Sequence, residues 1–87
     1  MGNYEIHLAT SVIKNLKSLP ANDIKKILTL IQSLAINPYP DGCRKLSGED
    51  YTYRVRQGNC RVIYEIENDI LRILILKIGH RKDVYKK

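Results

Sequence analysis

The first half of the chain has the apolar spacing of two helices. Apolar residues recur there at intervals of three and four, which is typical of one face of a helix. They are Val12, Ile13, Leu16 and Leu19 in one segment, and Ile24, Ile27, Leu28, Ile31, Leu34 and Ala35 in the next. Since only a few residues around Pro20 separate the segments, the helices are expected to form an antiparallel hairpin. Residues 37–48 are rich in turn-forming residues and are expected to end it.

The second half has the pattern of strands. β-branched and aromatic residues alternate with polar ones in residues 51–56, 61–66 and 70–78, and more weakly in residues 4–8. Gly58-Asn59 is a two-residue turn signal between the first two runs, so these form a β-hairpin. The predicted fold is α+β, in the order β-α-α-β-β-β. An N-terminal strand and an antiparallel helix hairpin pack on one face of a small, mainly antiparallel twisted sheet. The 87 residues are expected to form one domain, 1–87.

The turn predicts which side chains share a face of the hairpin. If Gly58-Asn59 is the turn, Arg56 pairs with Arg61 and Arg54 with Ile63. The helix-covered face then carries Tyr53, Val55, Val62, Tyr64 and Ile66, and Tyr51 is also assigned to the core. The open face carries Arg54, Arg56, Arg61, Ile63 and Glu65. Because like charges directly across a ladder are destabilising, this cluster indicates a surface that binds phosphate.

The last strand is predicted to add an apolar strip to the open face. A turn at Asn68-Asp69 pairs Glu65 with Arg72 and puts Leu74, Leu76 and Ile78 beside Ile63. A chain this short has no spare element to cover the strip. We therefore expect Ile63, Leu74 and Leu76 to bind a partner protein. The alternative is that the C-terminal residues fold back over them.

The composition agrees with a phosphate-bearing partner. The chain has 15 basic and 9 acidic residues, a formal net charge of +6, and its arginines all lie between Arg44 and Arg81. Arginine offers a planar fork that matches phosphate. Two cysteines are too few for a disulfide framework or a four-thiolate zinc site, and neither a metal nor a cofactor is expected. With no apolar run of about 18 residues and no signal-peptide pattern, a cytoplasmic protein is expected.

Three motifs together resemble the RelE/ParE toxin superfamily. They are YRVR at residues 53–56, GNCRVIYEI at residues 58–66 and IGHR at residues 78–81, followed by Tyr85. The resemblance covers the whole chain, and its ending is similar to the RelE-like branch. It implies a toxin of a type II toxin–antitoxin pair that cleaves messenger RNA on the ribosome and so inhibits translation. It also implies a cognate antitoxin whose helical segment wraps the toxin in a hetero-oligomer.

The resemblance further implies roles for single residues in metal-independent RNA cleavage. The basic hairpin residues, the arginine after the last strand and the terminal tyrosine of RelE-like proteins match Arg54, Arg56, Arg61, Arg81 and Tyr85. Arginine, with a pKa above about 12, is assigned to phosphate binding and charge stabilisation. Tyr85 is the expected base, and His80 is the alternative base or acid. The acid that protonates the leaving 5′-oxygen stays open, with Arg61 and His80 as candidates. Lys45 and Lys82 are expected to bind RNA with Arg54 and Arg56.

Two other functions are compatible with the same fold. One is a ParE-like toxin that inhibits DNA gyrase and has no catalytic residues of its own. The other is a non-catalytic module that binds RNA or protein. The clustered basic residues and the tyrosine near the chain end favour the nuclease.

Overall fold

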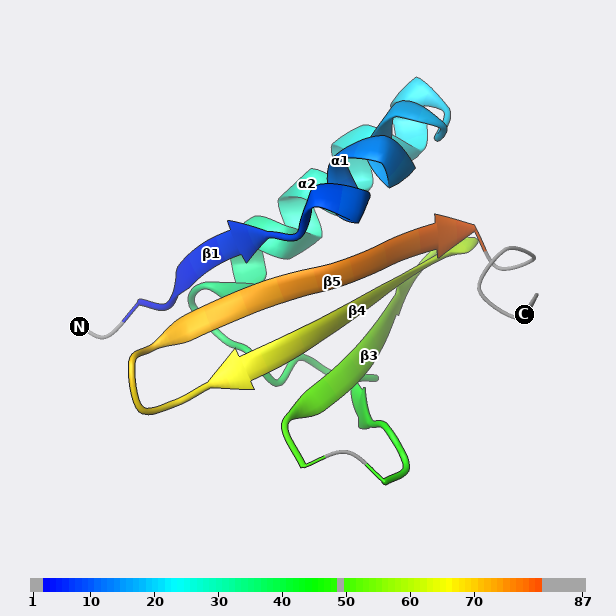
Figure 1. Ribbon diagram of the computed structural model, residues 1–87. Helices are drawn as coiled ribbons and strands as arrows, with labels where there is room; N and C mark the ends of the chain where they lie inside the picture. Colours follow the sequence, from blue (N-terminus) through cyan, green and yellow to red (C-terminus); the bar gives the residue numbers. More distant parts are fainter. Residues whose placement is uncertain (1–2, 49, 81–87) are drawn as a thin grey trace.

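The computed structural model describes residues 3–48 and 50–80. Its elements are β1 (Glu5–Leu8), α1 (Thr10–Lys17), α2 (Ala21–Leu34), β2 (Arg44–Lys45), β3 (Thr52–Gln57), β4 (Cys60–Glu67) and β5 (Arg72–His80). The strands form one sheet in the order β1-β5-β4-β3-β2. Only the β1–β5 pair is parallel among the described strands. The predicted α+β fold is confirmed (Figure 1). β2 is an additional short edge strand.

The helix hairpin covers one side of the sheet. α1 contacts β5, and α2 contacts β3 and β4. The core between the layers is apolar, and burial of each large side chain contributes about 1.5–3 kcal/mol. Its members include Val12, Ile27, Ile31 and Leu34 from the helices and Val55, Val62, Tyr64, Ile66, Ile73 and Ile75 from the strands.

Two residues of the predicted helix faces are exposed to solvent. Ile13 and Leu28 are exposed, whereas their neighbours Val12 and Ile27 are buried. Successive residues point about 100° apart around a helix, because one turn takes 3.6 residues. Each helix therefore buries only a narrow stripe against the sheet, and the residue after Val12 or Ile27 is turned toward solvent.

The predicted register of the β3–β4 hairpin is confirmed. Gln57 pairs with Cys60, Arg56 with Arg61 and Arg54 with Ile63. Gly58 has φ +61°, a conformation that glycine adopts without the steric cost of a side chain. The turn sequence therefore determines which side chains of both strands face away from the helices.

The β4–β5 connection is longer than predicted. The turn takes residues 68–71, so Glu67 pairs with Arg72 and the predicted Glu65–Arg72 pair is wrong. A guanidinium nitrogen of Arg72 lies 3.6 Å from a carboxylate oxygen of Glu67. The register moves by two residues, and side chains alternate with a period of two, so Leu74 keeps its predicted face.

A β-bulge in β5 then reverses the faces of the residues that follow it. Tyr64 pairs with Ile75 but Ile63 pairs with Lys77, so Leu76 is the extra residue. In a bulge two residues oppose one, which places Leu76 and Lys77 together opposite Ile63. Ile78 consequently lies in the core with 1% of its surface exposed. Its predicted place on the arginine face is wrong, because one extra residue moves every later side chain to the other face.

The tyrosines assigned to the core differ in burial. Tyr64 is fully buried, and the ring of half-buried Tyr53 stacks on it at a centroid distance of 6.1 Å. Tyr51 is 62% exposed, so its assignment to the core is wrong. The physical reason is that β3 begins at Thr52, and Tyr51 precedes the ladder whose alternation defines the buried face.

Candidate nucleic-acid interface

The sheet face opposite the helices gathers cationic side chains at one end. Directly paired residues of a ladder point to the same side, so Arg54, Arg56 and Arg61 share this face. Lys77 joins them through its pairing with Ile63. These residues and Arg44 lie at the end of the face nearest the β3–β4 turn. We call this surface the basic end, and its members are Arg44, Arg54, Arg56, Arg61 and Lys77.

Arg44 is a member of the basic end that the sequence analysis missed. β2 pairs Arg44 with Arg54 and Lys45 with Tyr53. Arg44 therefore shares the face of the arginines, whereas Lys45 shares the helix-side face of Tyr53. A two-residue strand has no periodicity, so no pattern in the sequence distinguishes Arg44 from Lys45. Lys77 was missed for a different reason, because the bulge before it is not visible in the apolar pattern.

The arginines differ in how open they are to solvent. Arg44 and Arg56 are exposed, and Arg54 is half-buried. Arg61 has only 2% of its surface exposed. The side chain of Arg61 is therefore shielded from solvent, while those of Arg44 and Arg56 can contact a ligand directly.

The predicted catalytic residues beyond the hairpin are only partly described. Arg81, Lys82 and Tyr85 lie outside the described residues. His80 is the last residue of β5 and pairs with Cys60, whose side chain is buried in the core. By strand alternation His80 is on the helix side of the sheet. The described ladder therefore does not bring His80 together with Arg54 and Arg56.

The other end of the same face has the opposite charge. Glu65 and Glu67 point away from the helices on β4, and Glu5 pairs with Arg72 on the neighbouring strand. With Asp69 in the β4–β5 turn, we call Glu5, Glu65, Glu67 and Asp69 the acidic end. Some of this charge is compensated locally, since a guanidinium nitrogen of Arg72 lies 3.6 Å from a Glu67 oxygen. The Nε2 of His7 lies 3.1 Å from a Glu5 oxygen. The face is thus polarised along the strands.

An apolar strip lies where the two ends meet. Ile63, Leu74 and Leu76 are half-buried and lie on the open face, as the sequence predicts for these three residues. Ile63 pairs with Arg54, and Leu74 pairs with Glu65. The strip therefore connects a positively charged surface with a negatively charged one.

Two buried groups have raised pKa values and are structural. Burial, with a smaller effect of the Cys43 thiol, raises the pKa of Tyr64 far above its ordinary value, and its hydroxyl donates to the carbonyl oxygen of Pro38 at 2.8 Å. Burial and the charge of Asp23 raise the pKa of the Cys60 thiol. Both groups stay protonated near neutral pH, so neither is suited to act as a base or nucleophile.

The described part of the chain offers no metal site and no membrane span. Within residues 3–48 and 50–80, no group of three or more His, Cys, Asp or Glu side chains could hold a metal ion. In the same ranges, no helix is long and apolar enough to cross a membrane.

Comparison with known proteins identifies relatives along nearly the whole chain. A family model described as the ParE toxin of the type II toxin–antitoxin system parDE matches residues 6–85. A Methanocaldococcus jannaschii protein named as a RelE1 toxin is 42% identical over an alignment of 87 positions, which covers 97% of this chain and 94% of that protein. Toxin RelG of Mycobacterium tuberculosis is 26% identical, with coverage of 97% and 98%.

Solved structures share the fold. A chain of the archaeal RelE–RelB complex from Pyrococcus horikoshii has a TM-score of 0.81 at 32% identity, covering 91% of this chain and 96% of that one. Isolated Escherichia coli RelE toxin has a TM-score of 0.77 at 14% identity, with coverage of 88% and 83%, a likeness of fold alone. The shared architecture is that of small toxins from toxin–antitoxin pairs. Within that class, this chain belongs to the RelE/ParE toxin superfamily and to its RelE-like branch.

Proposed function

We propose that this protein is the toxin of a type II toxin–antitoxin pair and a ribosome-dependent endoribonuclease that cuts messenger RNA and stops translation. The observation that carries the proposal is the basic end, where cationic residues of β2, β3, β4 and β5 gather on the face that the helices leave open. The RNA backbone has the complementary charge, and phosphate contacts supply most of the affinity for nucleic acid. A RelE-like family membership supports this substrate class. A ribosomal substrate would place the toxin in the cytoplasm.

The described arginines are assigned to binding the RNA backbone. Arg44 and Arg56 are exposed and Arg54 is half-buried, so these side chains can form two-pronged contacts with phosphate oxygens. Arg61 lies opposite Arg56 in the ladder and is buried, so we assign direct phosphate contacts to the other three arginines. We assign the contact at β2 to Arg44 instead of Lys45, because Lys45 belongs to the helix-side face.

The chemical step is assigned to residues that follow β5. The ribose 2′-oxygen attacks the adjacent phosphorus and its proton passes to the Tyr85 phenolate. The bond from phosphorus to the 5′-oxygen breaks, and the 5′-oxygen takes a proton from water. A 2′,3′-cyclic phosphate and a 5′-hydroxyl remain. Neighbouring guanidinium groups would lower the pKa of the Tyr85 phenol, and Arg81 would stabilise the charge that develops on the phosphorane. Since the β5 ladder directs His80 toward the helices, we favour Tyr85 over His80 as the base.

Mapping messenger-RNA 5′ ends in cells that express the protein tests the proposal. We expect new 5′-hydroxyl ends inside translated reading frames, and their loss when translation initiation is blocked. Arg81→Ala and Tyr85→Phe should abolish these ends, whereas Lys14→Ala, at an exposed site on α1, should keep them. Intact messenger RNA in growth-arrested cells, or full cleavage by both of the first two variants, would contradict the mechanism.

An antitoxin is the expected partner, because several structural neighbours are RelE–RelB complexes. We propose that a helical segment of the cognate antitoxin packs on Ile63, Leu74 and Leu76 and covers the basic end, forming a toxin–antitoxin hetero-oligomer. Co-expression with the protein encoded beside the toxin gene should give a stable complex and restore growth. Failure of the two proteins to co-purify would contradict this partnership.

Inhibition of DNA gyrase is the second candidate function. The family model that matches this chain is described as a ParE toxin, which favours this alternative. In that case DNA replication should stop before translation, messenger RNA should stay intact, and Tyr85→Phe should remain toxic. The order in which replication and translation stop after induction distinguishes the two functions.

A further inference from the structure

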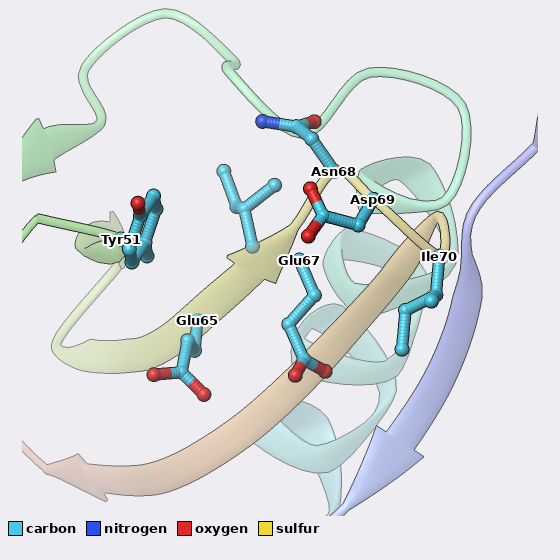
Figure 2. Close-up of a pocket in the computed structure, with 7 residues that line it drawn as sticks. Tyr51, Glu65, Glu67, Asn68, Asp69 and Ile70 are labelled. Carbon is cyan, nitrogen blue, oxygen red and sulfur yellow. The ribbon is translucent and has the colours of Figure 1, made fainter.

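A pocket at the acidic end lies apart from the residues that we assign to RNA binding and cleavage. It has a volume of about 290 Å³ and lies at the β4–β5 turn, and its lining includes Tyr51, Glu65, Glu67, Asn68, Asp69 and Ile70. The basic end lies at the other end of the β4–β5 pair, beside the β3–β4 turn. Figure 2 shows Tyr51 and Ile70 on opposite sides of the pocket, with Glu67 and Asp69 between them and Glu65 below Tyr51.

The rim of the pocket displays apolar side chains. Tyr51 is 62% exposed and Ile70 is 53% exposed. The neighbouring Leu71 has φ +51°, a left-handed conformation that is unfavourable for a bulky residue. Strain of this kind persists where the surrounding structure enforces it and is concentrated at functional sites. An aromatic ring and an aliphatic side chain flanking a hollow suit contact with a protein side chain that has an apolar stem.

The charge of the pocket requires that this side chain be cationic. Within the pocket, Glu67 contacts Arg72 at 3.6 Å. The ladder neighbours of Glu65 are Thr52 and Leu74, which carry no charge, and Asp69 is exposed in the turn. Negative charge is thus concentrated in one hollow of a protein whose net charge is +6. An RNA strand would be repelled here.

We propose that this pocket is an anchor site for an arginine or lysine side chain of the antitoxin, an inference that rests on the proposed toxin function. The aliphatic stem lies between Tyr51 and Ile70, and the cationic group reaches Glu65 and Asp69. Arginine is the better ligand, because its planar group stacks on an aromatic ring and pairs with carboxylates through two hydrogen bonds.

The polarity of the sheet face sets the direction of the bound segment. From Glu65 the face continues through Leu74 and Ile63 to Arg54, Arg56 and Arg61. A complementary segment is basic at the acidic end, apolar over the strip and acidic at the basic end. Residues 65 and 61 of β4 are separated by about 13 Å at about 3.3 Å per residue. A helix spans that distance in about nine residues. The antitoxin segment therefore carries its basic anchor about nine residues from its acidic groups.

Titration of the purified toxin with the protein encoded beside its gene tests the anchor with matched pairs of variants. Asp69→Asn is compared with Asp41→Asn, which removes an exposed carboxylate from the loop before β2. Ile70→Ser is compared with Ile36→Ser, at a residue that is 74% exposed. We expect Asp69→Asn and Ile70→Ser each to raise the Kd about 3- to 10-fold, as for loss of a partly exposed contact. The effect of Asp69→Asn should shrink as salt is added.

Charge exchange provides the sharpest outcome. Asp69→Lys should weaken binding further, and substitution of one antitoxin arginine or lysine by glutamate should restore it. The anchor is overturned if Asp69→Asn and Ile70→Ser bind within twofold of the wild type, or if the control variants lose as much affinity. RNA cleavage by the antitoxin-free toxin is measured separately. If the toxin cleaves RNA and the variants bind the antitoxin as tightly as the wild type does, the anchor is rejected and the proposed function stands. If the wild-type protein neither cleaves RNA nor binds the protein encoded beside its gene, the anchor and the proposed function are both rejected.

Discussion

The side-chain Oδ1 of Asn15 accepts a hydrogen bond from the backbone N–H of Ile78 at 3.0 Å. Asn15 is in α1, and Ile78 follows the bulge of β5. β1 ends at Leu8, opposite Ile75, so within the described residues β5 has no strand beside it on that edge from Leu76 onward. Side chains of α1 bond to this edge in place of a strand, since Ser11 Oγ also donates to the carbonyl oxygen of Leu76 at 3.3 Å. The helix therefore holds the part of β5 that leads to the proposed catalytic residues.

Replacing Asn15 by alanine should loosen this part of β5. The N–H of Ile78 loses its acceptor in a partly buried place, which costs about 1–2 kcal/mol of the free energy of unfolding. Asn15→Asp keeps an acceptor oxygen and should lose less. Urea unfolding measures the stability, and hydrogen exchange of the Ile78 amide reports the local effect. Equal exchange rates in Asn15→Ala and the wild type would contradict the assignment.

Neighbouring residues of β2 should differ in their effect on RNA binding. Arg44→Gln removes a cation from the basic end, and Lys45→Gln removes one from the helix-side face. We expect Arg44→Gln to weaken binding to single-stranded RNA and to reduce the slope of log K against log salt by about 0.7. Lys45→Gln should leave the slope near that of the wild type. Fluorescence anisotropy over a salt series makes the comparison, and identical slopes for the two variants would exclude a contact at Arg44.

Tyr64 should make the protein sensitive to alkaline pH. Its folded-state pKa is raised by burial above an unfolded value of about 10. Below pH of about 10 both states are protonated and the stability is full. As the pH rises further, the unfolded state loses its proton first and stability falls.

Substitution of Tyr64 by phenylalanine tests this linkage. Tyr64→Phe removes the ionisable group, so its stability should fall less steeply with pH above about 10. At neutral pH the variant should lose about 1–2 kcal/mol, since the buried carbonyl of Pro38 loses its donor. Tyr51→Phe, at an exposed site, is the matched control for neutral-pH stability. Chemical unfolding at several pH values measures both effects, and parallel pH profiles of Tyr64→Phe and the wild type would refute the first.

Gly58 should tolerate asparagine better than valine. A Cβ atom added at Gly58 meets nothing within 4 Å, so the cost of substitution comes from φ +61° and not from a clash. Valine is disfavoured in this conformation by about 1–2 kcal/mol, whereas asparagine adopts it more readily. Thermal unfolding should rank the wild type first, Gly58→Asn second and Gly58→Val last. Equal melting temperatures of the two variants would show that the turn does not need a left-handed residue.

The sequence by itself determined the helix hairpin and the β3–β4 hairpin, including the register that sets Arg54, Arg56 and Arg61 on one face. These features depend on neighbours along the chain. A two-residue turn leaves little choice of pairing, and alternation then assigns each side chain to a face. Alternation also explains why Leu74 keeps its predicted face, since a turn of residues 68–71 in place of two residues moves the register by two.

Only the tertiary structure decided which residues complete the site. Arg44 joins it through a two-residue strand, and Lys77 joins it while Ile78 leaves it because of one extra residue at Leu76. The peptide groups beside that bulge bond to Ser11 and Asn15, which are more than 60 residues away along the chain. The exposure of Tyr51 likewise depends on where β3 begins. Contacts between distant residues leave no periodic trace in the sequence, since each requires a partner whose position is set only when the whole chain has folded.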